Sequence, residues 1–80
     1  MEDAQVLAHI EQLVAEEHRL MRRAEEGRAQ PGDHARMDEL KVALDRTWDL
    51  LRQRRALRDR GQDANDASER PAEIVERYEQ

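Results

Sequence analysis

Five arginines stand within nine residues of the sequence, at Arg52, Arg54, Arg55, Arg58 and Arg60. A guanidinium group is permanently charged and matches carboxylates and phosphates in shape, so this cluster is suited to holding anions. Three interpretations stay open. The arginines pair with acids near the start of the chain (Glu2, Asp3 and Glu11), they hold an acidic partner or the acidic C-terminal segment, or they bind phosphate in a small ligand or a nucleic acid.

Nucleic acid is the least favoured of these ligands. The chain has a net charge of −5, and its aromatic residues are one Trp and one Tyr. Proteins that bind RNA or DNA are usually basic and often stack bases on aromatic side chains. A local contact between the arginines and a phosphate backbone remains the alternative.

Glu17 is a second candidate because it interrupts an apolar stripe. It follows Ile10 and Leu13 and precedes Leu20 at helical spacing. A buried carboxylate must be paired, protonated or hydrated. In an antiparallel hairpin Glu17 would lie opposite residues 44–48, so we expect a donor in the Trp48 indole or in an arginine of another chain. A register-fixing contact or an edge position is favoured over a functional carboxylate.

Metal binding and nucleophilic catalysis find little support. The sequence has no Cys, and His9 and His18 would lie on opposed faces of a helix. His34 and Asp38 form one i, i+4 pair, which is too few ligands for a metal site. Ser68 has no His nearby in the sequence, and there is no Gly-rich phosphate loop. We therefore expect no catalytic residue, no metal and no cofactor.

Two long helices must position these residues. Good helix formers dominate, and apolar residues recur at spacings of three and four. The pattern predicts helices over about 3–26 and 33–60, with a turn at 27–32 that contains Pro31-Gly32. Such a short connection makes consecutive helices antiparallel, giving a hairpin over residues 1–61. The expected N-caps are Asp3 and Asp33, and the expected C′ residues are Gly27 and Gly61.

The second helix carries more apolar surface than one neighbour covers. Its main stripe is Met37, Leu40, Leu44, Trp48 and Leu51, with Thr47 at the edge. A second line of Ala43, Leu50 and Leu57 lies to one side. A lone hairpin would leave Leu50 and Leu57 partly exposed, so the C-terminal segment, a second copy or a foreign helix should cover them. We expect a homodimer with this line or the Glu17 seam at its interface.

Residues 62–80 form an acidic C-terminal segment. Residues 62–70 lack large apolar side chains and are expected to form a loop or frayed turn. Pro71 can begin a short helix over about 71–79. Its apolar face, Ile74, Val75 and Tyr78, is expected to dock on Leu50, Leu57 and Trp48, because so short a helix is marginal alone.

Charge and hydropathy place the chain in solution. Residues 1–27 carry a net charge of −4, residues 28–60 carry +3, and residues 61–80 carry −4. An acidic helix therefore lies beside a basic one in the hairpin. The acidic N-terminus is unlike a signal peptide, and no apolar run approaches the ~20 residues of a membrane helix. The expectation is a cytoplasmic protein with no membrane contact.

The chain resembles a family of short uncharacterised bacterial proteins, mainly actinobacterial and grouped as a domain of unknown function. The string Trp-Asp-Leu-Leu-Arg-Gln-Arg-Arg over 48–55 carries this resemblance, with Glu-Glu-His-Arg-Leu over 16–20 and the Arg70-Pro71 and Tyr78 region. The resemblance implies a free-standing small protein and brings no activity, cofactor or catalytic residue.

A second pattern is similar to the first helix of the helical chorismate mutases. It comprises Leu44-Asp45, Leu50-Leu51, Arg54-Arg55 and Leu57. Those small dimeric bundles hold an anionic substrate between arginines and acids by electrostatics. Here the pattern lies on the second helix, and no long third helix follows it.

The sequence thus predicts an all-α hairpin with a short C-terminal helix or tail packed back on it, completed by dimerisation. The favoured function is non-enzymatic, in protein interaction or regulation, with a second copy or a partner helix as the binding partner. The alternative is an anion- or nucleic-acid-backbone-binding module, and the remote alternative is a small helical enzyme. The candidate interaction residues are Glu17, Trp48, Leu50, Arg52, Arg54, Arg55, Leu57, Arg58 and Tyr78.

Overall fold

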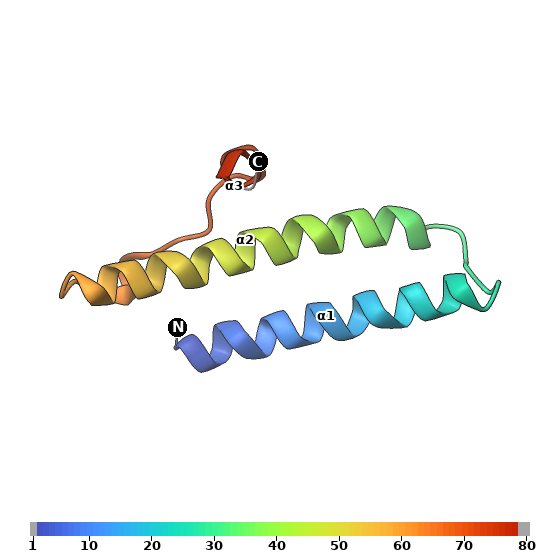
Figure 1. Cartoon of the computed structure of the whole chain (residues 1–80), viewed down its shortest axis with the longest axis horizontal. Helices are drawn as coiled ribbons and strands as arrows, with labels where there is room; N and C mark the ends of the chain where they lie inside the picture. Colours follow the sequence, from blue (N-terminus) through green and yellow to red (C-terminus); the bar gives the residue numbers. More distant parts are fainter. Residues whose placement is uncertain (1, 79–80) are drawn as a thin grey trace.

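Two long helices lie side by side and antiparallel in the computed structural model, which describes the backbone of residues 2–78 and the side chains of residues 2–75 (Figure 1). Helix α1 spans Asp3–Glu25 and helix α2 spans Asp33–Asp59. A 3-10 turn, η1, spans Ala64–Asp66, and a short helix, α3, spans Ala72–Tyr78. The predicted all-α fold, a hairpin with a short C-terminal helix packed back on it, is confirmed.

The N-caps of the two long helices lie one residue before the expected ones, so the helices begin at Asp3 and Asp33. Glu2 caps α1 in a reciprocal box with Gln5, whose side-chain oxygen accepts the Glu2 amide at 2.7 Å. Gly32, with φ of 89°, precedes α2. The predictions of Asp3 and Asp33 as N-caps are therefore wrong. Their carboxylates point elsewhere: Asp33 accepts the backbone amide of Gln30 within the turn, and Asp3 accepts arginines of α2.

Both long helices end as predicted, at a glycine in the left-handed region. Gly27 has φ of 71° and Gly61 has φ of 73°. The amide after each glycine donates back to a carbonyl in the last helical turn, from Arg28 to Arg23 and from Gln62 to Leu57, at 2.8 Å each. The second of these turns reverses the chain and sends the C-terminal segment back along α2 (Figure 1).

The core lies between α1 and α2 in two adjoining clusters. One contains Val6, Ile10, Leu50 and Leu51, and the other contains Leu13, Leu20 and Leu40. Leu50 is thus packed with residues of α1, and Ala67 also packs on its cluster. The C-terminal segment was one of the three covers expected for the line of Leu50 and Leu57, and its residue Ala67 packs on the cluster that contains Leu50.

The inner line of α2 also differs from the expected one. Thr47 is 2% exposed, whereas Trp48, placed in the main stripe by the sequence pattern, is 42% exposed. Thr47 can be buried because its hydroxyl donates to the Ala43 carbonyl at 2.7 Å, so no polar group is left unpaired. The side of α2 that faces α1 therefore carries Leu40, Thr47, Leu51 and Arg54. Trp48 lies beside this side and stays exposed.

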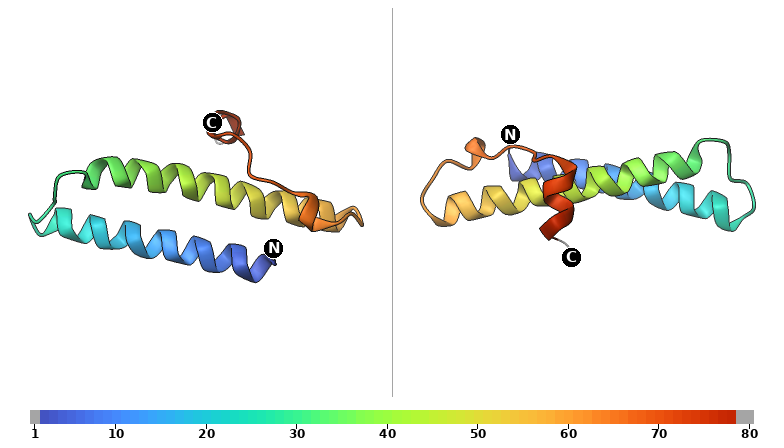
Figure 2. Two further views of the ribbon diagram at one scale, coloured as in Figure 1. Left: turned by 180° about the vertical axis from the view of Figure 1, so that it is seen from behind. Right: turned by 90° about the horizontal axis from the view of Figure 1, so that it is seen from above.

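The C-terminal segment covers the side of α2 that faces away from α1, so α2 lies between α1 and this segment (Figure 2). Helix α3 crosses the middle of α2 and buries Val75 completely, but Ile74 remains 39% exposed. Of the expected receivers, Leu50 belongs to the cluster with α1, Leu57 faces Ala67 ahead of α3, and Trp48 is 42% exposed. The side chain of Tyr78 lies outside the described residues.

The residues before α3 also contain more structure than expected. Asp63 caps η1 by accepting the Asn65 amide at 2.9 Å. The expected loop over 62–70 therefore includes one ordered turn. Within residues 2–78, no helix is long and apolar enough to cross a membrane.

Candidate functional site

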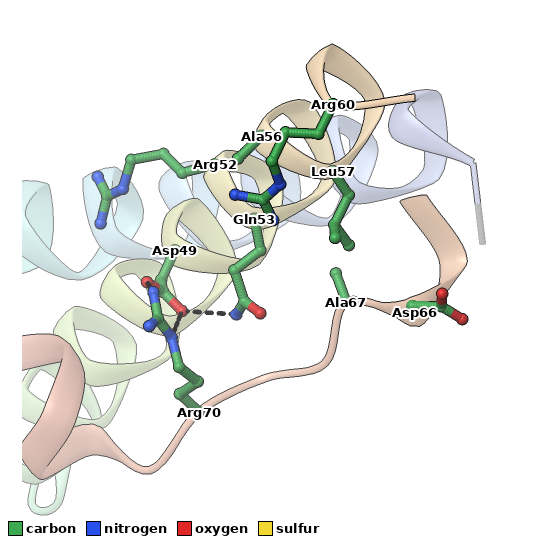
Figure 3. Close-up of a pocket in the computed structure, with 9 residues that line it drawn as sticks. All are labelled: Asp49, Arg52, Gln53, Ala56, Leu57, Arg60, Asp66, Ala67 and Arg70. Atoms are coloured by element: carbon green, nitrogen blue, oxygen red, sulfur yellow. Dashed lines mark hydrogen bonds and ion pairs between the residues drawn. The ribbon is translucent and has the colours of Figure 1, made fainter. Parts of the chain in front are cut away.

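A groove runs between the C-terminal half of α2 and residues 62–71, the strap that leads to α3 (Figure 3). Its volume is about 740 Å³. Polar side chains on its walls come from both segments, and small or apolar ones form its floor. The lining residues are Asp49, Arg52, Gln53, Ala56, Leu57, Arg60, Asp66, Ala67 and Arg70.

A buried ion pair closes one end of this groove. Asp49 is 1% exposed and accepts two hydrogen bonds from the Arg70 guanidinium, one of them from Nε at 2.9 Å. Gln53 donates to the same carboxylate at 2.9 Å and to the Ser68 carbonyl at 2.7 Å. The Arg70 hydrogen bond is the main reason that the pKa of Asp49 lies below its ordinary value, because burial alone would raise it. Asp49 therefore stays ionised and ties the strap to α2.

Arg46 adds a second tie near the same end. Its Nε donates to the Arg70 carbonyl at 3.0 Å, and its Nη2 lies 3.6 Å from Glu69. None of Arg46, Asp49, Gln53 and Arg70 was predicted from the sequence as a site residue. Helical spacing places the first three on the outer face of α2, but it carries no signal for the arginine 21 residues away that completes the set.

A third group of ion pairs and hydrogen bonds joins the start of α1, the end of α2 and η1. Asp3 accepts Arg54 Nε at 2.7 Å and Arg58 Nη2 at 2.6 Å. Arg54 is 5% exposed and also donates to Asn65 Oδ1 at 3.0 Å. The Arg58 and then the Arg54 hydrogen bonds lower the pKa of Asp3. The predicted pairing of the arginine cluster with the first helix is thus confirmed at Asp3, while no such bond is formed by Glu2 or Glu11 among the described residues.

Arg52, Arg55 and Arg60 are what remains of the arginine cluster. All three are exposed, and none of their side chains forms a hydrogen bond or ion pair with another described residue, although the charge of Arg52 contributes to the lowered pKa of Asp49. Arg52 and Arg60 line the groove together with Leu57 and Ala67, and the Arg52 side chain extends away from these two residues (Figure 3). This arrangement can hold carboxylates or phosphates attached to an apolar group.

The other predicted interaction residues lie apart from this groove. Glu17 is half-buried and forms no hydrogen bond with another described residue, so the expected bond from Trp48 is absent. Trp48 lies at the open edge of the hairpin, and Leu50 lies in the core. Among the described residues, no three His, Cys, Asp or Glu side chains come together in a way that could hold a metal ion.

The paired carboxylates predict how stability depends on pH. Hydrogen bonds from arginines or backbone lower the pKa values of Asp3, Glu16, Asp33 and Asp49. A carboxyl whose pKa is lower in the folded state stabilises that state above its unfolded pKa, and this contribution is lost as pH falls through the folded pKa. We expect the urea midpoint to be level above about pH 5 and to fall progressively below the ordinary values of 3.8 for Asp and 4.5 for Glu.

Circular dichroism across pH 2–7 would measure this trend. The Asp49→Asn variant should lose part of the acid-dependent change because its side chain cannot be protonated in this range. The matched substitution Asp38→Asn, at an exposed residue, should leave the curve almost unchanged. A midpoint that rises as the pH falls below 4 would contradict the prediction.

Comparison with known proteins places the whole chain in one family. The model of a family described as a protein of unknown function, DUF2630, matches residues 2–80. The chain belongs to this family. Similar proteins include uncharacterised proteins of Mycobacterium bovis and of Mycobacterium tuberculosis, each 44% identical over 77 residues, which cover 95% of this chain and 88% of the relative. No solved structure matches the chain.

Proposed function

We propose that this protein is a non-enzymatic interaction protein that binds an acidic segment of a partner protein in the groove between α2 and the strap. One observation carries this proposal. Arg52 and Arg60 line the groove without an ion pair to another described residue, although Arg54 and Arg58 from the same cluster are held by Asp3. Exposed guanidinium groups in a groove that is also lined by apolar side chains suit a peptide that carries both acidic and apolar side chains.

The charge pattern around the groove supports a peptide over a polyphosphate or a nucleic acid. Asp66 lines the groove as an exposed acid, and the chain as a whole carries a net charge of −5. A densely charged polyanion would be repelled by both. A peptide with spaced carboxylates can place them at the arginines and its apolar side chains on Ala56, Leu57 and Ala67.

The state of Asp49 supports a binding role over catalysis. It is the buried carboxylate of the groove, and Arg70 and Gln53 occupy it with three hydrogen bonds. Its lowered pKa keeps it ionised and weakly basic at neutral pH. A general acid or base works best with a pKa near the operating pH, so Asp49 is suited to holding the strap.

Charge reversal in the groove tests the proposal. The double variant Arg52→Glu/Arg60→Glu should bind a fluorescent peptide of alternating Glu and Leu at least tenfold more weakly than the wild type, because it replaces two attractions with two repulsions. Fluorescence anisotropy in 50 mM and 150 mM salt would measure the dissociation constants. The control Arg19→Glu/Arg22→Glu makes the same charge change on the exposed side of α1 and should bind as the wild type does.

Two results would reject the proposal. Equal weakening by the groove and control variants would show that only overall charge matters. Stronger binding of inorganic pyrophosphate or single-stranded RNA than of the peptide would assign the arginines to phosphate. In cells, a photo-crosslinker at Ala56 should capture an acidic segment of one protein in the presence of nuclease, and the groove variant should lose that product.

A further inference from the structure

The open side of the hairpin carries a row of apolar side chains. Met21 of α1 lines one pocket together with Met37 and Lys41 of α2, which shows that these residues share a side. Leu7 and Val14 precede Met21 at seven-residue spacing and so lie on the same face of α1. Leu44 and Trp48 follow Met37 at spacings of seven and four on α2. The row, called the open face below, is Leu7, Val14, Met21, Met37, Leu44 and Trp48.

Three residues of the open face remain exposed in the described chain, whereas Val14, Met37 and Leu44 are half-buried against the core clusters. Leu7 is 38% exposed, Met21 is 44% exposed and Trp48 is 42% exposed. The strap and α3 are tied to the outer side of α2 through Arg46, Asp49 and Gln53 (Figure 2). Three large apolar side chains with this exposure are a substantial fraction of the apolar surface in so small a domain.

The charges beside the open face are of opposite sign on the two helices. Glu17 lies on α1 between Val14 and Met21 in the sequence. It is half-buried, and its side chain forms no ion pair with another described residue. Lys41 lies beside the row on α2, is exposed, and likewise has no ion pair within the described residues. Residues 1–27 carry a net charge of −4 and residues 28–60 carry +3, so α1 is acidic and α2 is basic when each is taken as a whole.

We infer that a second copy of this chain covers the open face, with a twofold axis that runs parallel to the helices. That axis stacks the acidic α1 of each copy on the basic α2 of the other and forms a four-helix bundle. A twofold axis perpendicular to the helices, in the plane between the copies, would stack α1 on α1 and place like charges together. Charge complementarity therefore selects both the occupant and its orientation.

The register follows from the symmetry. Within one chain, the ion pairs Asp3–Arg54 and Arg23–Asp33 fix which residues of α1 and α2 lie at the same height. Leu7 lies near the height of Trp48, Val14 near Leu44, and Met21 near Met37. Rotation about an axis parallel to the helices leaves each height unchanged, so the same residues meet between copies. Glu17 of one copy then lies beside Lys41 of the other.

The single tryptophan of the chain reports directly on this interface. Between 1 µM and 500 µM, we expect sedimentation to detect a change from monomer to dimer, with a blue shift of the Trp48 emission over the same range. Trp48→Ser should raise the dimer dissociation constant at least tenfold. Ile74→Ser, which removes an equally exposed apolar side chain on α3, should leave it within twofold of the wild type.

Mixing two charge variants tests the register. Glu17→Lys places like charges together in its own homodimer, and so does Lys41→Glu. In a heterodimer of the two variants, both contacts between copies have opposite charges, because one joins the introduced lysine to the introduced glutamate and the other joins the native Glu17 to the native Lys41. Native mass spectrometry of an equal mixture should give heterodimer well above the statistical half of all dimers.

Three outcomes would overturn the inference. These are a wild-type chain that stays monomeric to 500 µM, a dimer that Trp48→Ser does not weaken, or a mixture with the statistical amount of heterodimer. A monomer that binds a foreign helix through Trp48 would assign the face to that helix. The open face and the groove are separate surfaces, so Trp48→Ser should leave peptide binding unchanged.

Discussion

Replacing Arg70 with alanine is expected to lower the free energy of unfolding by about 2–4 kcal/mol, because it leaves the Asp49 carboxylate buried without its cationic partner. Gln53 can supply one hydrogen bond, but a neutral amide does not offset the loss of the charge. The variant can reduce the cost of this unpaired carboxylate in one way. The strap and α3 can detach from α2 and let water reach Asp49, which limits the cost to the free energy that docks them.

Two measurements together test this prediction. Urea unfolding at fixed chain concentration gives the change in stability, and hydrogen exchange at Val75 shows whether α3 detaches. The control Arg22→Ala removes an exposed arginine of α1 and should change stability by less than about 0.5 kcal/mol. Asp49→Asn combined with Arg70→Gln should be less damaging than Arg70→Ala, since no buried charge remains. Equal stability of Arg70→Ala and wild type would refute the structural role of the pair.

Replacing Leu51 with alanine is expected to cost about 2–5 kcal/mol. Leu51 is 1% exposed and belongs to the cluster with Val6, Ile10 and Leu50, so its removal leaves a cavity between the two long helices. A chain of this size has a total stability of roughly 5 kcal/mol or less, because its one core is small. A substantial fraction of the variant should therefore be unfolded at 25 °C.

Circular dichroism at 222 nm during thermal unfolding would measure this loss. The matched substitution Leu57→Ala lies on the same helix at a half-buried site beside the groove, and it should cost less than half as much. Similar costs for the two variants would show that the core between α1 and α2 does not dominate stability. Both chains must be compared at one concentration, because dimerisation would add to the apparent stability.

The long helices and the turn between them could be predicted because their signals are local. Helix-forming residues, apolar spacing and the breakers Gly27, Pro31-Gly32 and Gly61 all act within a few residues. The ends differ from the prediction by only one residue. Helix α1 ends at Glu25 instead of 26, and α2 ends at Asp59 instead of 60.

The candidate site could be predicted only in part. Pairing of the arginine cluster with acids near the start of the chain was one of the interpretations open from the sequence, but the sequence did not indicate that Arg54 and Arg58 are the two that pair with Asp3. A small rotation of α2 decides which side chains face α1. The same rotation buries Thr47 and exposes Trp48, although the apolar pattern favours the opposite arrangement.

The sequence by itself determined the all-helical character, the antiparallel hairpin and the acidic and basic halves, because these depend on residue type and on neighbours along the chain. The tertiary structure decided the rotation of α2, the path of the strap and the identity of the free arginines. Those features depend on contacts such as Asp49 with Arg70 and Asp3 with Arg54, which are 21 and 51 residues apart. Residue spacing within one helix cannot identify a partner residue that becomes a neighbour only when the chain folds.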